Sequence, residues 1–163
     1  MTSRNRKAST GRFGLSISIL NRAAHRYFQC ALEPYGLGPG QQAYLMAILP
    51  GELIVQDELA GRLKVDKANV TRAVRGLQEL GYIDRIQDGA DRRCRLVSLT
   101  DRGAEVRLEV ESSSARWLKL LSEGVEEAHW ALLEDLLDVV VRNAVHATDE
   151  SHGVSSDFRR SNC

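Results

Sequence analysis

Apolar side chains recur every three or four positions along much of this chain of 163 residues. That spacing places them on one side of an α-helix, in which about 3.6 residues make one turn. The first helix is expected over 13–33, and a second begins near Pro39 and stops at Pro50. Two longer helices are expected over 101–121 and 126–147. The pattern therefore predicts a mainly α-helical protein.

A pair of shorter helices is expected between these segments. Apolar positions mark the first of the pair in 57–63, and a tight turn follows over 63–66. Asp66 is placed to cap the second helix, and Gly81 is placed to end it. One apolar stripe runs along that helix, formed by Val70, Ala73, Val74 and Leu77,. Two short helices with so brief a connection predict a helix-turn-helix.

Two short β-runs follow directly, over 82–86 and 94–99,. The segment between them, 88–93, is rich in turn-forming residues and contains two adjacent arginines,. A helix-turn-helix followed by such a two-stranded hairpin is a winged helix. Thr100 is expected to cap the long helix that comes next.

The side of the second short helix that lies opposite its apolar stripe suits a DNA groove. Arginine bonds bidentately to guanine edges, asparagine bonds to adenine edges, and threonine offers a hydroxyl and a methyl group. Ala68 allows close approach, and Lys67 is expected to meet a phosphate. The candidates for major-groove contact are Asn69, Thr71, Arg72 and Arg75. Many solvated helices also carry two arginines and a threonine, so this helix alone leaves both interpretations open.

The hairpin tip supplies a second candidate contact with DNA. Arg93 is expected to enter the minor groove, with Arg92 beside it. Asp91 is expected to orient Arg93 through a charge-assisted hydrogen bond. The tip and the helix together favour DNA recognition over a merely solvated surface.

Five sequence motifs resemble those of the MarR family of bacterial transcription regulators. The most discriminating is the wing pattern D-x-x-D-R-R at 88–93. The others are V-D-K-x-x-V-T-R-x-V, L-G-Y-I, L-T-x-x-G and G-L-x-P, at 65–74, 80–83, 99–103 and 36–39. Two positions depart from the family pattern. Ala90 replaces a common wing arginine, and Gln42 replaces a common aromatic residue.

The resemblance implies one domain over 13–147, with a winged helix-turn-helix and its small β wing at about 53–99. It implies that helices at about 13–33 and 101–147 interlock two subunits. The last helix supports this expectation, because its apolar arc is too wide for a single interface,. The implied function is a homodimeric repressor that binds a pseudo-palindromic double-stranded DNA operator and is released by a small aromatic or phenolic ligand.

The resemblance also implies a ligand pocket between the dimer frame and the winged helix. Side chains able to line it are His25, Tyr27, Tyr44, Met46 and Trp117. Each of these residues is equally suited to a structural, half-buried position.

The three cysteines are too widely spaced for a disulfide framework or a metal-ligand pair,. A reactive thiol needs cationic neighbours and access to solvent. Arg26 is the only obvious cation near Cys30 in the sequence, which is little to activate a thiol, so a buried and unreactive Cys30 is expected. Cys94 is expected to pack in its strand, and Cys163 to be exposed. A thiol-based redox regulator that uses Cys30 is the alternative.

The charge distribution supports a nucleic-acid partner although the formal net charge is zero. Residues 62–95 contain nine Lys and Arg against five Asp and Glu, whereas residues 105–138 contain three against nine. A positive lobe on an acidic body retains attraction for phosphates. We expect a disordered basic arm over 1–12 and a disordered polar tail over 148–163.

Other classes of function find little support. The histidines form no metal-binding pair, and no catalytic set or phosphate-binding glycine loop can be assembled, so no enzyme, metal or cofactor is expected,. No apolar run is long enough to span a membrane, and a cytoplasmic protein is expected. A winged-helix module that binds a protein partner instead of specific DNA is a further alternative.

Overall fold

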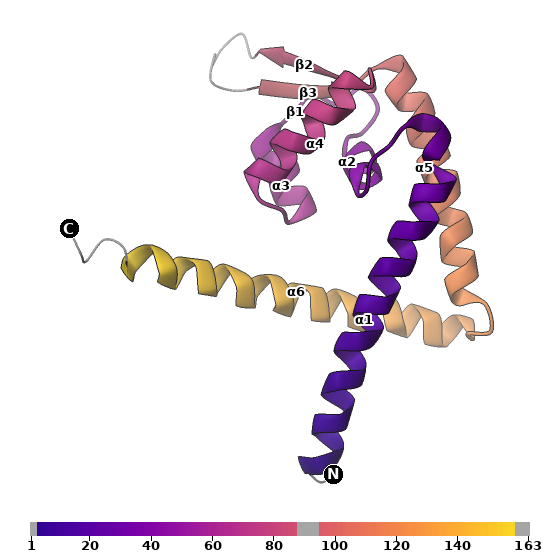
Figure 1. Ribbon diagram of the computed structural model, residues 1–163, viewed down its shortest axis with the longest axis vertical. Coiled ribbons are helices and arrows are strands. Elements are labelled where there is room, and N and C mark those ends of the chain that lie inside the picture. The colour runs from indigo at the N-terminus through magenta and orange to yellow at the C-terminus, as the bar shows by residue number, and fades with distance from the viewer. Residues whose placement is uncertain (1–2, 88–94, 159–163) are drawn as a thin grey trace. The chain divides into compact units, whose positions relative to one another are not determined.

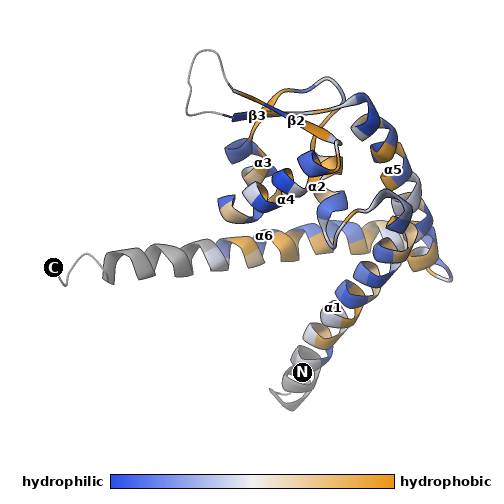
Figure 2. Ribbon diagram, turned by 45° about the horizontal axis from the view of Figure 1, so that its top comes forward, coloured by the Kyte–Doolittle hydropathy of each residue, from blue (hydrophilic) through white to orange (hydrophobic). Residues whose placement is uncertain are grey.

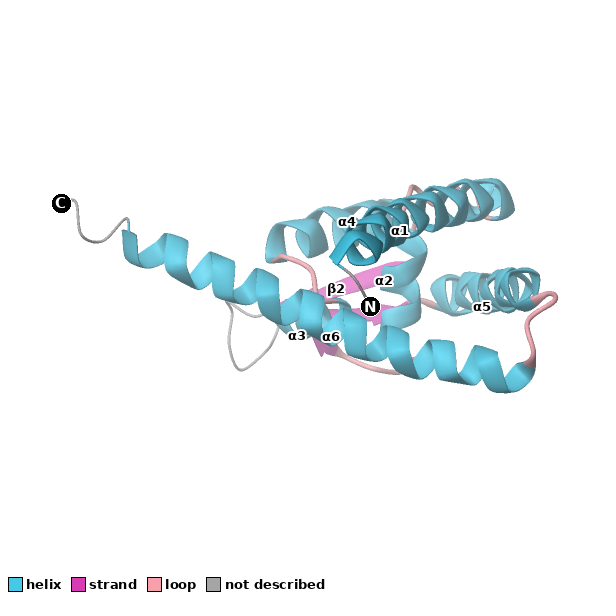
Figure 3. Ribbon diagram, turned by 90° about the horizontal axis from the view of Figure 1, so that it is seen from below, coloured by secondary structure: helices cyan, strands magenta, loops and turns pink. Residues whose placement is uncertain are grey.

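The computed structural model describes residues 3–87 and 95–158 (Figure 1). The chain divides into two compact units, Met1–Leu118 and Lys119–Cys163. Figure 3 shows that helices dominate the described chain and that the strands form one small sheet. A mainly α-helical winged fold was expected from the sequence, and this expectation is confirmed. None of the described helices is both long and apolar enough to cross a membrane.

The first unit contains the winged helix-turn-helix. Its helical elements are α1 (Ser3–Ala31), the 3-10 helix η1 (Glu33–Tyr35), α2 (Gln41–Ala47), α3 (Gln56–Leu63), α4 (Lys67–Glu79) and most of α5 (Asp101–Ser122). The second unit contains the end of α5 and the helix α6 (Glu127–Phe158).

The helices α1 and α6 are longer than the sequence suggested. They extend into the segments expected to be a basic arm and a polar tail, so their ends differ from the expected boundaries at residues 13 and 147. Neither segment contains proline. Adding a residue to an existing helix needs no new nucleus, and polar residues therefore continue it at low cost.

Three antiparallel strands form the sheet, where only two were expected. β2 (Ile83–Gln87) pairs with β3 (Arg95–Leu99), as the hairpin pattern indicated. The additional strand is β1 (Ile54–Val55), which pairs with the other edge of β3 through Ile54 opposite Val97. Two residues are too few to show an alternating pattern. β1 is a strand because β3 offers it a partner, which sequence alone does not reveal.

Burial decides which side of α4 faces inward. The side chains of Val70, Val74 and Leu77 have 0% exposure and pack with Leu45 of α2 and Leu59 of α3. Burial of each such side chain stabilises the fold by roughly 1.5–3 kcal/mol. An exposed ion pair contributes about 1 kcal/mol or less, so the predicted apolar stripe sets the orientation and leaves the polar side outside.

The ends of α4 and the start of α5 are as the sequence predicted. Asp66 Oδ1 accepts a hydrogen bond from the backbone N–H of Asn69 at 2.7 Å, which is an N-cap. Gly81 has a φ of 75°, the left-handed conformation that stops a helix,. The backbone N–H of Gly103 donates to Thr100 Oγ1 at 2.9 Å, so Thr100 caps α5.

The helix α2 ends at Ala47, earlier than the expected stop at Pro50. The residue before a proline, here Leu49, is disfavoured in a helix, and Ile48, one position earlier, is already extended.

In the loop between α2 and α3, the carboxylate of Glu52 accepts from the backbone N–H of Leu49 at 2.9 Å and pairs bidentately with Arg62 at 2.8 and 2.9 Å. Arg62 and this N–H lower the pKa of Glu52 from 4.5 to about 2. The loop is thus tied to α3.

The motifs L-G-Y-I and L-T-x-x-G meet in one backbone contact. A Cβ atom on Gly103 would lie 1.8 Å from the carbonyl oxygen of Tyr82 and 2.8 Å from its carbonyl carbon. That oxygen also accepts from the backbone N–H of Thr100 at 3.1 Å. The Tyr82 hydroxyl donates to the Tyr35 carbonyl at 2.6 Å, and Arg102 lies 5.2 Å from the ring centre. Only glycine permits this approach of α5 to the wing.

We expect Gly103→Ala to lower the free energy of unfolding by about 1–3 kcal/mol or more, because the obstructing atoms are backbone and relieving the clash shifts whole elements. Urea unfolding at one fixed protein concentration measures the change. The matched control is Gly61→Ala in α3, where a Cβ meets nothing within 4 Å. The control is expected to gain about 0.5–1 kcal/mol. Equal stability of the two variants would contradict the proposed constraint.

Candidate nucleic-acid interface

The outer side of α4 is an exposed, mostly polar surface with two arginines. The side chains of Lys67, Ala68, Thr71, Arg72 and Arg75 are all exposed, and Asn69 is half-buried. The structure therefore brings together all six helix residues that the sequence singled out. Ala68 lies in the first turn, and its small side chain leaves room for DNA to approach the helix backbone there.

Ion pairs hold two cations of this surface in place. Lys67 Nζ lies 2.6 Å from Asp57 Oδ2 of α3, and Arg75 Nε lies 2.9 Å from Glu79 Oε1. All four side chains are 64% or more exposed. Such pairs contribute about 1 kcal/mol or less, so a phosphate or a base edge can displace the carboxylates at small cost.

The N-terminal end of α4 has a hydrogen-bonded chain of side chains. Asn69 Nδ2 donates to Asp66 Oδ2 at 2.8 Å, and Arg72 donates to Asn69 Oδ1. Tyr44 of α2 lies close by. Burial raises the pKa of Tyr44, the Asp66 carboxylate raises it further, and Arg72 lowers it. Tyr44 therefore shares the electrostatic environment of this helix end, and it packs against the buried core.

The turn between α3 and α4 supplies a cation that the sequence analysis did not include among the contacts. Lys64 has a φ of 54° and is exposed in the turn before α4. In a helix-turn-helix the second helix, here α4, is called the recognition helix. Its backbone N–H bonds to the carbonyls that end α3. Arg95, at the start of β3, is also exposed. Their positive charge was visible in the sequence, but their orientation depends on the turn and the sheet.

The wing-tip candidates Asp91, Arg92 and Arg93, together with Cys94, lie outside the described residues. The strands on either side are described, and β2 packs against α4. The base of the wing is thus held against the recognition helix.

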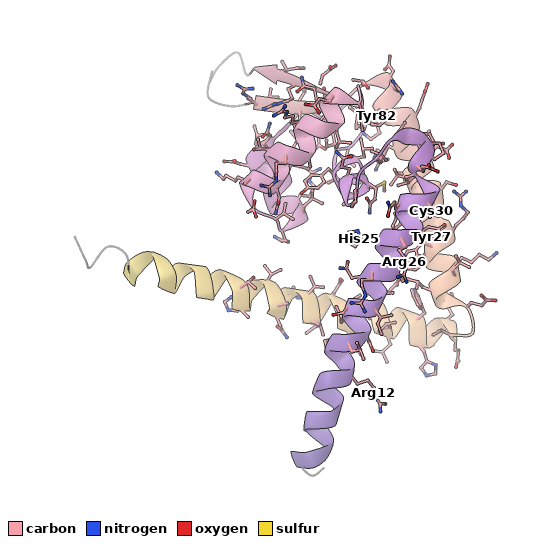
Figure 4. All side chains as sticks on the ribbon, viewed as in Figure 1. Arg12, His25, Arg26, Tyr27, Cys30 and Tyr82 are labelled. Carbon is pink, nitrogen blue, oxygen red and sulfur yellow. The ribbon has the colours of Figure 1, made fainter. Side chains whose placement is uncertain are left out.

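The aromatic residues considered for ligand binding do not form one cluster. Tyr27 packs against Trp117 of α5 with 4.9 Å between ring centres, and its hydroxyl donates to the Ser113 carbonyl at 3.2 Å. Figure 4 shows Tyr27 on α1, with His25 and Arg26 on the same helix. Tyr44 and Met46 instead pack against the core of the winged helix.

A small hollow lies at the end of α1 and the start of α2. Its empty volume is about 210 Å³, which includes open solvent. His25 is the one ligand candidate that lines it, and Gln42 and Phe28 lie on its wall. Because part of that volume is open solvent, the enclosed space falls far short of the roughly 300–1,000 Å³ that is usual for a drug-sized ligand.

Cys30 is exposed in this chain, whereas a buried position was expected. It lies on the side of α1 that no other described element of the unit covers, and a helical sequence pattern does not show which sides will be covered. Among residues 3–87 and 95–158, no group of three His, Cys, Asp or Glu side chains is arranged to hold a metal ion.

Comparison with known proteins identifies the family of this chain. A profile of the MarR family matches residues 35–93. The HTH-type transcriptional regulator BilQ of Clostridioides difficile (strain CD3) is 29% identical over 114 residues, which are 70% of this chain and 77% of BilQ. The crystal structure of MarR is 32% identical, with a TM-score of 0.72, over 84% of this chain and 92% of MarR.

The PcaV transcriptional regulator from Streptomyces coelicolor, solved in complex with its natural ligand, has a TM-score of 0.73 at 23% identity. Its match covers 80% of this chain and 92% of PcaV, and it supports the fold alone. The match to MarR covers the same share of its partner but reaches 32% identity, which supports kinship as well as fold. With the exposed recognition helix and the three-stranded wing, these similarities show that the chain belongs to the MarR family of DNA-binding winged helix-turn-helix transcriptional regulators, which are not enzymes.

Proposed function

We propose that this protein is a repressor that binds a pseudo-palindromic DNA operator as a homodimer and is released by a small aromatic or phenolic ligand. In this proposal α4 enters the major groove, and the wing reaches the adjacent minor groove. The two units act as one domain over about 13–147. The site of action is the cytoplasm, where bacterial DNA lies.

One observation carries the DNA-binding part of the proposal. Val70, Val74 and Leu77 on the apolar side of α4 are fully buried, and the opposite side exposes residues 68, 72 and 75. The two arginines therefore point into solvent from a helix whose position is fixed by the core. Arg72 and Arg75 can bond to guanine edges, and Thr71 can contact a base methyl group. Lys67 and Lys64 can reach phosphates beside them.

The wing part of the proposal rests on the sequence. Arg93 is assigned to the minor groove, with Arg92 beside it and Asp91 orienting Arg93. Arg85 and Arg95 belong to the strands below the tip. Their charge adds to the attraction that this part of the chain has for the DNA backbone.

The homodimer is supported by apolar surface that each unit leaves exposed. In α6 the exposed apolar residues are Leu132, Leu133, Leu136, Leu137, Val139, Val140 and Val141, with exposures from 39% to 54%. Figure 2 shows hydrophobic positions recurring along α6 and α1. An exposed apolar surface of this kind marks an interaction site. A second copy of the chain is the simplest partner, and a two-fold dimer requires a pseudo-palindromic operator.

In this proposal the operator is released when an aromatic ligand binds. The ligand favours a dimer whose two recognition helices are wrongly spaced for successive major grooves. A ligand shifts such an equilibrium by its differential affinity for the two states. His25, Tyr27, Tyr44, Met46 and Trp117 are the candidate contacts. Tyr27 packs on Trp117 with the ring planes inclined at 31°, so aromatic side chains of α1 and α5 already meet there.

We expect Arg72→Ala and Arg75→Ala each to weaken operator binding by about 1–3 kcal/mol, or roughly fivefold to 150-fold in Kd. Each loses contacts with a base edge that alanine cannot replace. Fluorescence anisotropy measures the Kd on an operator selected from genomic fragments with the purified protein. Wild-type affinity is expected to fall steeply between low and moderate salt.

The matched control for these two variants is Arg142→Ala, which removes the same charge from the polar side of α6. Its operator affinity is expected to remain within about twofold of wild type. If Arg72→Ala and Arg75→Ala also keep wild-type affinity, a protein-binding winged helix becomes the better interpretation. Salt-independent binding would lead to the same conclusion.

We expect Leu136→Glu to convert the dimer to a monomer, because it places a carboxylate in the middle of the apolar side of α6. Sedimentation equilibrium at micromolar concentration measures the mass. Operator affinity should fall by roughly 10²–10⁴-fold as avidity is lost. Asp138→Ala, on the polar side of the same helix, is expected to remain dimeric. A monomeric wild-type protein contradicts the proposal.

We expect benzoate or phenol at millimolar concentration to release labelled operator from the wild-type protein, measured as a fall in anisotropy. Cyclohexanecarboxylate is the matched control, since it has the charge and size of benzoate without the aromatic ring. Tyr27→Ala should blunt the release. If hydrogen peroxide releases the operator instead, and Cys30→Ser abolishes that effect, the thiol alternative replaces the aromatic-ligand proposal.

A further inference from the structure

Asn69 joins two charged side chains on the recognition helix. Its Nδ2 donates to Asp66 Oδ2 at 2.8 Å, and its Oδ1 accepts from a terminal guanidinium nitrogen of Arg72. The three residues are spaced three apart, so they lie along one side of the helix. The chain therefore runs from the N-cap of α4 to an exposed arginine, with a neutral amide in the middle.

The orientation of the Asn69 amide is determined by what its neighbours can do. A carboxylate such as Asp66 only accepts hydrogen bonds, and a guanidinium such as Arg72 only donates them. The amide must turn its NH₂ group to Asp66 and its oxygen to Arg72, because the reverse orientation would oppose two acceptors and two donors. Asparagine suits this position because an aspartate would face a second carboxylate.

The anchor of this chain is firm on the Asp66 side. The other carboxylate oxygen, Oδ1, accepts from the backbone N–H of Asn69 at 2.7 Å. The positive end of the helix dipole favours a carboxylate at this position. Asn69 itself is half-buried, whereas Arg72 is exposed. Asn69, which is itself bonded to the N-cap residue Asp66, thus accepts a hydrogen bond from Arg72 and orients it.

An arginine that is free in solution must lose rotamer freedom when it binds a base. If its guanidinium is already oriented in the unbound protein, that loss has occurred on folding, and binding is stronger and more selective. Arg75 has a different partner, Glu79. Asn69 is therefore the residue through which the N-cap can orient Arg72.

We infer that Asn69 is a positioning residue for Arg72 and does not read a base of its own. The inference rests on the proposed function, in which α4 reads DNA. Asparagine reads adenine by offering one donor and one acceptor together. Asn69 uses one N–H of its Nδ2 for Asp66 and one lone pair of its Oδ1 for Arg72,. Turning the amide toward a base edge would break both charge-assisted hydrogen bonds, so the amide orients the arginine, and the arginine selects the base pair.

A double-mutant cycle tests this assignment. The Kd for the selected operator is measured for the wild type, Asn69→Ala, Arg72→Ala and the double variant. We expect Asn69→Ala to weaken binding by roughly twofold to tenfold, the usual effect of losing a hydrogen bond. The double variant should match Arg72→Ala within about twofold, because Asn69 acts through Arg72. Losses that multiply in the double variant would overturn the inference.

The base preference of each variant gives a second readout, which a loss of helix stability would not change. Every operator base pair is substituted in turn. We expect Asn69→Ala and Arg72→Ala to lose preference at the same base pair, and Thr71→Ala to keep preference there. Loss of preference at a different base pair in Asn69→Ala would show that it reads a base itself.

Folding of the Asn69→Ala variant is expected to be intact, because the backbone N–H that bonds to Asp66 is retained. Circular dichroism and the thermal unfolding midpoint check this. If Arg72→Ala weakens binding and Asn69→Ala behaves as wild type, the inference fails and the proposed function stands. If Arg72→Ala also keeps wild-type affinity and base preference, both fail.

Discussion

The close approach of two backbones, those of Tyr82 and Gly103, is the constraint on which the winged helix depends. The carbonyl of Tyr82 occupies the space that a side chain at residue 103 would need. The same carbonyl accepts from Thr100, whose hydroxyl caps α5 and donates to the Gly81 carbonyl. The end of α4, the start of β2 and the start of α5 therefore meet at one point. The base of the wing cannot move relative to the recognition helix without breaking these bonds.

This junction explains how a small β-sheet and a helix can act as one DNA-reading surface. The core fixes α4 through its buried valines and leucine, and the Glu52–Arg62 pair holds the loop that leads into α3. The polar side of α4 is left with weak, exposed contacts such as Lys67 with Asp57. A rigidly supported helix with weak ion pairs suits DNA binding. Its cations can exchange their carboxylate partners for phosphates and bases at small cost.

Signals that act within a few residues were predicted well. The Asp66 cap, the stop at Gly81 and the cap at Thr100 all depend on side chains or φ angles close to the affected backbone. The end of α2 was expected at Pro50 but lies at Ala47, and the strand β1 was not predicted, because it depends on a neighbouring strand. Burial of Cys30 was wrongly expected for the same reason, since this side chain is exposed. A helical pattern shows which residues share a side but not what covers that side.

The sequence by itself determined the order of the six α-helices in the described chain and of the two hairpin strands, the polar and apolar sides of α4 and the family motifs, because helix periodicity and caps are local properties of the chain. Only the tertiary structure decided that Tyr82 excludes a side chain at Gly103, that Lys67 meets Asp57, and that Asn69 is committed to Asp66 and Arg72. The first two contacts depend on how separate elements pack. The third depends on which rotamers two flexible side chains adopt, and spacing along a helix permits many rotamers while selecting none.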